Sequence, residues 1–174
     1  QTEGKAYGLQ TKVNGNTFEL GGSGKYVFDK EKGADVHIYD ICRYESDTLA
    51  EKVVIPERLN EYRIGGVKAI NSENVKNLVL SDGIMFIENT EKSLGCPNLE
   101  CIVMPDELVS IQGKGLGADI VLIGNRNTYA EYYSKKNGNV FRELGDINND
   151  GKVSVSDLVK TISGVLCADK TDEM

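Results

Sequence analysis

Several residue types that mark particular enzyme classes are scarce or absent in this chain. Its 174 residues include one histidine, no tryptophan and three prolines. One histidine cannot supply the paired ligands of an H-E-x-x-H zinc site, and neither a G-x-S-x-G sequence nor a phosphate-binding glycine loop occurs. The acidic pair Asp40 and Glu45 could act in hydrolysis, but nothing in the sequence links it to a cleft. We therefore expect no enzymatic activity.

Basic residues and long apolar runs are also scarce. Lys and Arg together number 20 against 27 Asp and Glu, which gives a formal net charge of −7. Nucleic acids and anionic membrane surfaces bind clustered basic residues, so neither is expected as a partner. No run of about 18 apolar residues occurs, so we expect no membrane insertion. The start at Gln1 is compatible with removal of a signal peptide or with a fragment of a longer chain.

The most specific pattern that is present is the stretch DINNDGKVSVSD at 146–157. Oxygen-bearing residues alternate along it, and Gly151 stands at position 6, where an EF-hand-like calcium loop needs a sharp turn. Position 12 is Asp, where Glu is usual. The alternative interpretation is an Asx-rich surface turn before a helix. The predicted Ca²⁺ ligands are Asp146, Asn148, Asp150, the backbone carbonyl of Lys152, Ser154 and Asp157.

An apolar stripe with the spacing of one helix face follows the loop, at Val155, Leu158, Val159, Ile162 and Leu166. The segment GDINNDGKVSVSDLVKTISGVL resembles the first half of a type I dockerin, over roughly the last 30 residues. Dockerins carry two such repeats, and a second loop is absent here. The resemblance implies a cohesin-like domain as an alternative partner. An isolated helix of about ten residues is marginal in water, so we expect the stripe to pack on the end of the preceding domain, with calcium as a structural clip.

The first third of the chain has β-strand signals. Asn14-Gly15, between TKV and NTFEL, predicts a type I′ hairpin, because both central residues of that turn need positive φ. The glycines within 21–24 are expected to break the chain before further strands, one of them at 35–39. His37 in that strand is interpreted as a solvent-facing residue and not as a catalytic base.

From residue 53 onward the sequence repeats itself. VVIPERL, LVLSDGIMFI and IVMPDELVSI align with Ile55, Leu80 and Met104 in register, at offsets of 25 and 24 residues. This period is typical of leucine-rich repeats. Each unit is predicted to be a short strand, a turn and an irregular return. A unit of this size cannot bury its own apolar face, so stacked neighbours must share one core.

The repeat register predicts which strand side chains face the core. Side chains alternate along a strand, so Val53, Leu78 and Ile102 should form one inward column, and Ile55, Leu80 and Met104 another. The column between them contains Val54, Val79 and Val103 and should point outward. An apolar stripe on a sheet face predicts a partner-binding surface. The alternatives are that β-branched residues simply suit strands, or that the N-terminal hairpin covers the stripe.

The run CPNLECI at 96–102 precedes the third strand. Together with the following PDELVSI it resembles BspA-type leucine-rich repeats, over about residues 50–143. Proteins with BspA-type or dockerin modules are typically exported, so the resemblance implies a secreted or cell-surface location. Cys96 and Cys101 are interpreted as buried free thiols, and a bridge between them is the alternative.

A short helix is expected to close the repeats. Thr128 and Glu131 have capping-box spacing, and Gly138 is predicted to be the left-handed stop. A strand at 139–144 should then lead into the calcium loop.

The sequence thus predicts a mainly β chain with short helices. Residues 1–50 form an N-terminal β cap, 51–144 form BspA-type leucine-rich repeats in a solenoid, and 145–174 form a dockerin-like calcium loop plus helix. The predicted function is extracellular or cell-surface binding and adhesion to a protein or host-matrix ligand, with a structural calcium site. The alternative is a dockerin-type assembly module that anchors the repeats to a cohesin-like partner.

Overall fold

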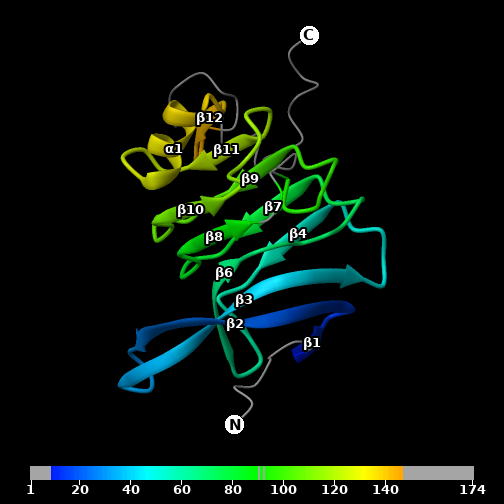
Figure 1. Cartoon of the computed structure of the whole chain (residues 1–174), viewed down its shortest axis with the longest axis vertical. Coiled ribbons are helices and arrows are strands. Elements are labelled where there is room, and N and C mark those ends of the chain that lie inside the picture. Colours follow the sequence, from blue (N-terminus) through cyan, green and yellow to red (C-terminus); the bar gives the residue numbers. More distant parts are fainter. Residues whose placement is uncertain (1–8, 90, 92, 147–174) are drawn as a thin grey trace.

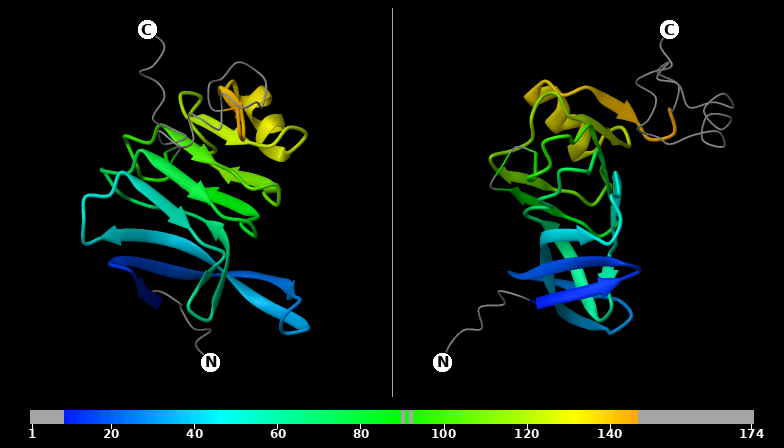
Figure 2. Two further views of the ribbon diagram at one scale, coloured as in Figure 1. Left: turned by 180° about the vertical axis from the view of Figure 1, so that it is seen from behind. Right: turned by 90° about the vertical axis from the view of Figure 1, so that its right-hand side faces the viewer.

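The computed structural model describes residues 9–89, 91 and 93–146. These residues form a mainly β chain with one short helix, as predicted, arranged as a β-solenoid of about four turns (Figure 1). Figure 2 shows the turns stacked along the long axis, with the N-terminal strands at one end. No helix in the described part of the chain is long and apolar enough to cross a membrane.

Two sheets form the walls of the solenoid. Sheet A has the order β1-β2-β3-β6-β8-β10, with β5 paired to β6, and sheet B has the order β12-β11-β9-β7-β4. The strands of sheet A are β1 (Leu9–Val13), β2 (Asn16–Asp29), β3 (Ala34–Ser46), β5 (Arg58–Leu59), β6 (Tyr62–Val67), β8 (Phe86–Asn89) and β10 (Ser110–Gly113). Those of sheet B are β4 (Lys52–Ile55), β7 (Asn77–Leu80), β9 (Cys101–Val103), β11 (Val121–Gly124) and β12 (Phe141–Glu143).

The repeat register predicted from the sequence is confirmed in sheet B. Strands β4, β7 and β9 pair in parallel, with Val53 opposite Leu78 and Leu78 opposite Ile102. Both predicted inward columns are buried in the core between the sheets. A fourth strand, β11, continues the stack and pairs in parallel with β9. Stacking therefore supplies the shared core that one repeat cannot form alone.

The prediction of irregular returns was wrong, because each return contains a strand of sheet A. Strand β6 pairs with β8, and β8 pairs with β10, in both cases in parallel. Ile87 and Ile111 lie opposite each other in β8 and β10, and both are buried in the core. Pairing between successive returns satisfies backbone groups that would otherwise need water.

The N-terminal cap extends sheet A beyond the edge of sheet B. Asn14 and Gly15 have φ values of 51° and 78°, which confirms the predicted hairpin turn. The glycines within 21–24 do not break the chain, contrary to the prediction. Strand β2 runs through them, and a register shift against β3 between Gly22 and Tyr26 absorbs the extra residues as a bulge.

The helix α1 (Tyr129–Asn137) lies against β11 and β12 at the other end of the solenoid. Gly138 ends it in the left-handed conformation, as predicted. The capping-box prediction gave the wrong hydrogen-bond partners for Thr128 and Glu131. The Thr128 hydroxyl donates to the Asn125 carbonyl at 2.6 Å, and Glu131 accepts the Asn127 N–H at 2.7 Å. The strand expected at 139–144 is the shorter β12, which pairs in parallel with β11.

The three described cysteines differ in state. Cys42 and Cys96 are free, and Cys96 is fully buried, as predicted. Cys101 is disulfide-bonded. The free-thiol interpretation of Cys101 was therefore wrong, and so was the alternative of a bridge to Cys96. Cys101 lies on the outer face of sheet B, where a thiol does not share the inner core with Cys96.

Candidate binding surface

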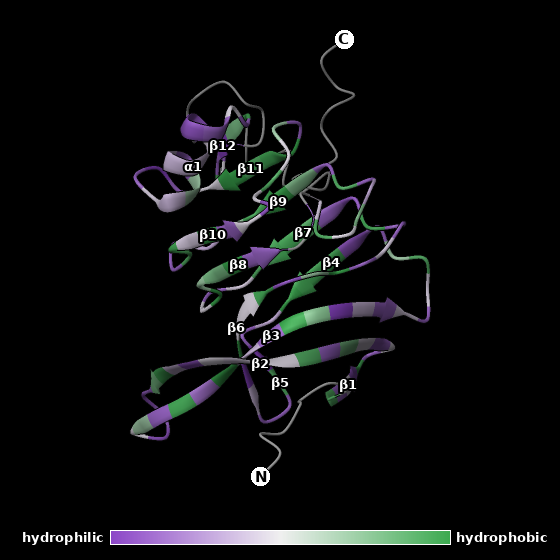
Figure 3. Ribbon diagram, viewed as in Figure 1, coloured by the Kyte–Doolittle hydropathy of each residue, from purple (hydrophilic) through white to green (hydrophobic). Residues whose placement is uncertain are grey.

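The predicted outward column runs across the outer face of sheet B. Val54 lies opposite Val79, and Val79 lies opposite Val103. Figure 3 shows apolar residues along the strands that carry this column. Exposure falls along it, from 48 % at Val54 through the partly buried Val79 to 8 % at Val103. The column is therefore open to solvent at the β4 end.

The open end of the column borders a surface cavity of about 320 Å³, which we call the cap groove. It lies where the β1–β2 turn and the end of β3 approach strand β4. Three of the lining residues are buried, namely Phe18, Tyr44 and Val53, and five are exposed, namely Asn14, Asp47, Thr48, Lys52 and Val54. The groove thus has buried, largely apolar side chains at its base and mainly polar side chains around it.

Two side chains from different cap strands hold the interior of the cap groove. The rings of Phe18 and Tyr44 lie 5.3 Å apart in a tilted arrangement. The Tyr44 hydroxyl donates a hydrogen bond to Asn16 Oδ1 at 2.9 Å. Both rings are almost fully buried, so packing holds them in place.

Strand β4 adds unpaired backbone groups to this site. It is the last strand of sheet B, and among the described strands only β7 pairs with it. The free edge of a sheet presents N–H and C=O groups that another extended chain can pair with. Leu49, in the loop before β4, is 80 % exposed.

Of the predicted calcium ligands, only Asp146 lies within the described residues. It lies three residues after the end of β12, and its N–H donates to the Glu143 carbonyl at 2.9 Å. Asp146 is buried. The pKa of Arg126 is raised, chiefly by its hydrogen bond to Glu143, and the charge of Asp146 contributes. Asn148, Asp150, Lys152, Ser154 and Asp157 lie outside the described residues, so the calcium loop stays a prediction.

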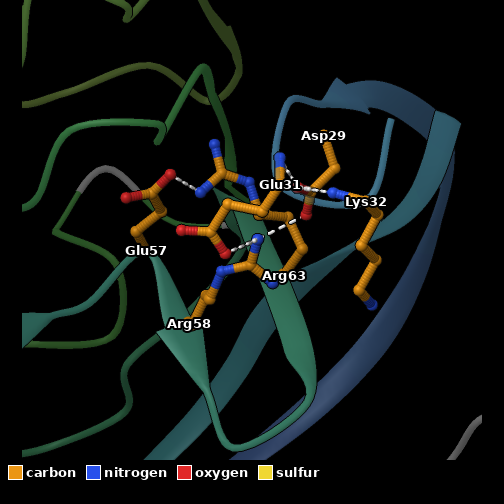
Figure 4. Close-up of polar contacts among 6 residues, drawn as sticks. All are labelled: Asp29, Glu31, Lys32, Glu57, Arg58 and Arg63. Carbon is orange, nitrogen blue, oxygen red and sulfur yellow. Dashed lines mark hydrogen bonds and ion pairs between the residues drawn. The ribbon is translucent and has the colours of Figure 1, made fainter. Parts of the chain in front are cut away.

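A second polar site, which the sequence analysis missed, lies at the turn between β2 and β3. There Asp29 pairs with Arg58 of β5, and Arg63 of β6 pairs with Glu57 (Figure 4). The carboxylate of Asp29 also accepts the N–H groups of Glu31 at 2.9 Å and Lys32 at 3.1 Å. The sequence DKEKG contains the signal for such an Asx turn, but its partner Arg58 is distant in sequence. These contacts pin the β2–β3 turn to the first solenoid turn.

The contacts of the Asp29 carboxylate make the stability of the fold depend on pH. The hydrogen bond from Arg58 lowers the pKa of Asp29 below its usual 3.8, and the two backbone N–H groups act in the same direction. The carboxylate therefore stabilises the fold above its usual pKa, and this contribution is lost as pH falls through the lowered value. We expect Asp29→Asn to lower the Tm at pH 7, with the difference from the natural chain shrinking below about pH 4. Calorimetry across this pH range measures the difference.

The matched control is Asp35→Asn, at an exposed position of β3. It should leave the Tm close to that of the natural chain at every pH. An equal loss of Tm in both variants would contradict the stabilising role of the Asp29 carboxylate.

His37, Asp40 and Glu45, the residues considered for catalysis in the sequence analysis, all lie on β3. His37 is partly buried between the rings of Tyr26 and Tyr39, at centroid distances of 5.3 and 4.7 Å. Asp40 and Glu45 lie on the same strand, but each is beside its own cation. Lys68 Nζ is 3.4 Å from the buried Asp40, and Glu45 pairs with Arg43 at the surface.

Comparisons with protein-family models, curated proteins and solved structures found no match to this chain. The resemblances to BspA-type leucine-rich repeats and to dockerins therefore stay predictions.

Proposed function

We propose that this chain is a secreted or cell-surface binding and adhesion protein that takes a protein or host-matrix ligand at the cap groove. The observation that carries the proposal is the position of Val54. This exposed residue lies on the free edge strand of sheet B and also lines a cavity of about 320 Å³, beside Phe18 and Tyr44. The free edge of sheet B, the exposed side chain of Val54 and the cavity therefore lie at the same place.

The geometry favours an extended segment of a partner protein as the ligand. Such a segment could add a strand beside β4, with main-chain hydrogen bonds supplying affinity. One apolar side chain of that segment would enter the groove against Phe18 and Tyr44, and the polar rim would contact its neighbours. Backbone pairing tolerates many sequences, whereas the groove selects the side chain that enters it.

In this proposal calcium has a structural role at the opposite end of the solenoid. The proposed ligands are the six named from the sequence, beginning with the buried Asp146, three residues after the end of β12. A cation there would neutralise carboxylates that the loop brings together. Extracellular calcium, at about millimolar concentration, occupies even weak sites of this kind.

The test uses capture of ligands from host matrix by the full chain and by Val54→Asp. A charge at the mouth of an apolar groove must be desolvated on binding, so capture should fall by about tenfold or more. The matched control is Val140→Asp, which changes an equally exposed valine, 54 % against 48 %, at the other end of the chain. Equal capture by both variants would contradict the cap groove as the site.

A second experiment, on the calcium dependence of capture, distinguishes this function from the dockerin-type alternative. In our proposal Asp150→Ala and a chelator lower stability but leave capture at the groove largely intact. Capture that is abolished by both treatments, yet unchanged in Val54→Asp, would indicate assembly on a cohesin-like partner instead. Isolated cohesin-type domains and host-matrix preparations should therefore be assayed side by side.

A further inference from the structure

We propose that the end of the β2–β3 hairpin binds a neutral oligosaccharide, at a site separate from the cap groove. This site has two parts, a row of aromatic rings and a polar cavity, and both lie beside Phe28. It is at the far end of strands β2 and β3 from the cap groove, where the hairpin projects from the solenoid (Figure 1).

The first observation is a pair of exposed aromatic side chains near the tip of the hairpin. Tyr26 is 68 % exposed and Phe28 is 60 % exposed. The two residues are two positions apart in β2, so their side chains point to the same face of the strand, roughly 7 Å apart. Neighbouring exposed apolar side chains mark binding surfaces, whereas single scattered ones are ordinary.

The exposed ring of Tyr26 is the end of a row of rings that starts in the core. Tyr39 and Tyr62 pack against the core, with their ring centroids 5.1 Å apart. The His37 ring lies 4.7 Å from that of Tyr39 and 5.3 Å from that of Tyr26. Tilted and edge-to-face contacts of this kind orient each ring against the next. A ligand that stacks on Tyr26 therefore has less side-chain motion to immobilise.

The second observation is the polar cavity, of about 360 Å³, which Phe28 helps to line. Its other lining residues are all charged, three of them acidic and three basic: Asp29, Glu31, Glu57, Lys30, Arg58 and Arg63. Arg58 pairs with Asp29, and Arg63 pairs with Glu57 (Figure 4). The formal charges cancel, so the cavity presents hydrogen-bonding groups without a net charge that would attract an ion.

This combination fits the chemistry of a neutral sugar. A pyranose ring has an apolar face of C–H groups and a rim of hydroxyls, each of which both donates and accepts hydrogen bonds. The C–H face can stack on Phe28, while hydroxyls accept from guanidinium N–H groups and donate to carboxylate oxygens of the cavity. A charged ligand would instead compete with the existing ion pairs. The second exposed ring, that of Tyr26, provides a platform for a further sugar of the same chain.

The first test is calorimetric titration of the full chain with three neutral probes, namely cellohexaose, maltohexaose and the hexasaccharide of N-acetylglucosamine. We expect binding of at least one probe, and Phe28→Ala should weaken it about tenfold or more, because the stacking surface is lost. The matched control is Tyr132→Ala, which removes a similarly exposed ring, 57 % against 60 %, from α1 at the other end of the solenoid. Absence of binding to all three probes, or equal losses in both variants, would overturn the proposal.

The second test separates this site from charged ligands and from the cap groove. A neutral ligand should keep its affinity when NaCl is raised from about 0.05 to 0.5 M, because screening acts on charges. Tighter binding of a sulfated oligosaccharide than of every neutral probe would refute the neutral class. Val54→Asp should leave oligosaccharide binding unchanged, even where it abolishes capture of a protein ligand at the cap groove. Equal weakening by Val54→Asp and Phe28→Ala would contradict a separate site.

Discussion

Replacing Leu78 by alanine should lower the free energy of unfolding by about 2–5 kcal/mol. Leu78 is completely buried in the middle strand of the repeats, opposite Val53 on one side and Ile102 on the other. The substitution leaves a cavity between two neighbours whose backbones are fixed by strand pairing, so the site cannot collapse around it. Urea denaturation followed by circular dichroism measures the change.

The control for Leu78→Ala is Val54→Ala in the same sheet. Val54 is 48 % exposed on the outer face, so its truncation should change stability by no more than about 0.5 kcal/mol. Similar losses for both variants would mean that the inner column does not dominate the stability of the solenoid.

Replacing Gly113 by alanine should cost about 3 kcal/mol. Gly113 ends β10 with a φ of 76°, and a Cβ there would lie 2.0 Å from the carbonyl oxygen of Asn89. A left-handed alanine costs about 1–2 kcal/mol, and forcing apart two backbones adds a further 1–3 kcal/mol, approximately. The loss should appear as a lower denaturation midpoint.

Gly24 provides a matched control, because its φ of 70° is nearly the same and a Cβ there would meet no atom within 4 Å. Gly24→Ala should therefore cost only the conformational part, about 1–2 kcal/mol. Equal losses in the two variants would show that close backbone approach between β8 and β10 contributes nothing.

The register of sheet B could be predicted from sequence because three buried residues recur at nearly constant offsets. Ile55 and Leu80 are the last residues of β4 and β7, Met104 follows β9 directly, and the core selects apolar side chains at all three positions. The hairpin at Asn14-Gly15 was equally accessible, because its turn chemistry is local. Local chemistry and regular spacing are the two signals that one sequence supplies.

The return strands of sheet A, β6, β8 and β10, gave no comparable signal. Each short return strand places few side chains in the core, such as Ile87 in β8 and Ile111 in β10. A lone apolar residue does not reveal the period of a strand, and the pairing partners lie a full turn away in sequence. The register shift at Gly22 was missed because glycines mark both chain breaks and bulges.

The candidate site was only partly predictable for the same reason. Val54 was identified from its column, but the groove beside it also needs Phe18 and Tyr44, which come from two other strands. Neither aromatic residue carries a local sign that it lines a cavity. The long-range pairing of the cap with the solenoid determines that arrangement.

The two kinds of strand pairing in this chain also imply an order of folding. In the long antiparallel hairpin, pairing of β2 with β3 begins at Asp29 and Ala34, across a short turn. Val53 and Leu78, in contrast, meet only after a loop of some two dozen residues has closed, which costs more chain entropy. The hairpin should therefore nucleate first and act as the template on which successive turns are laid down. During synthesis the hairpin leaves the ribosome before the solenoid turns do, so the turns can add to it one after another as they are made.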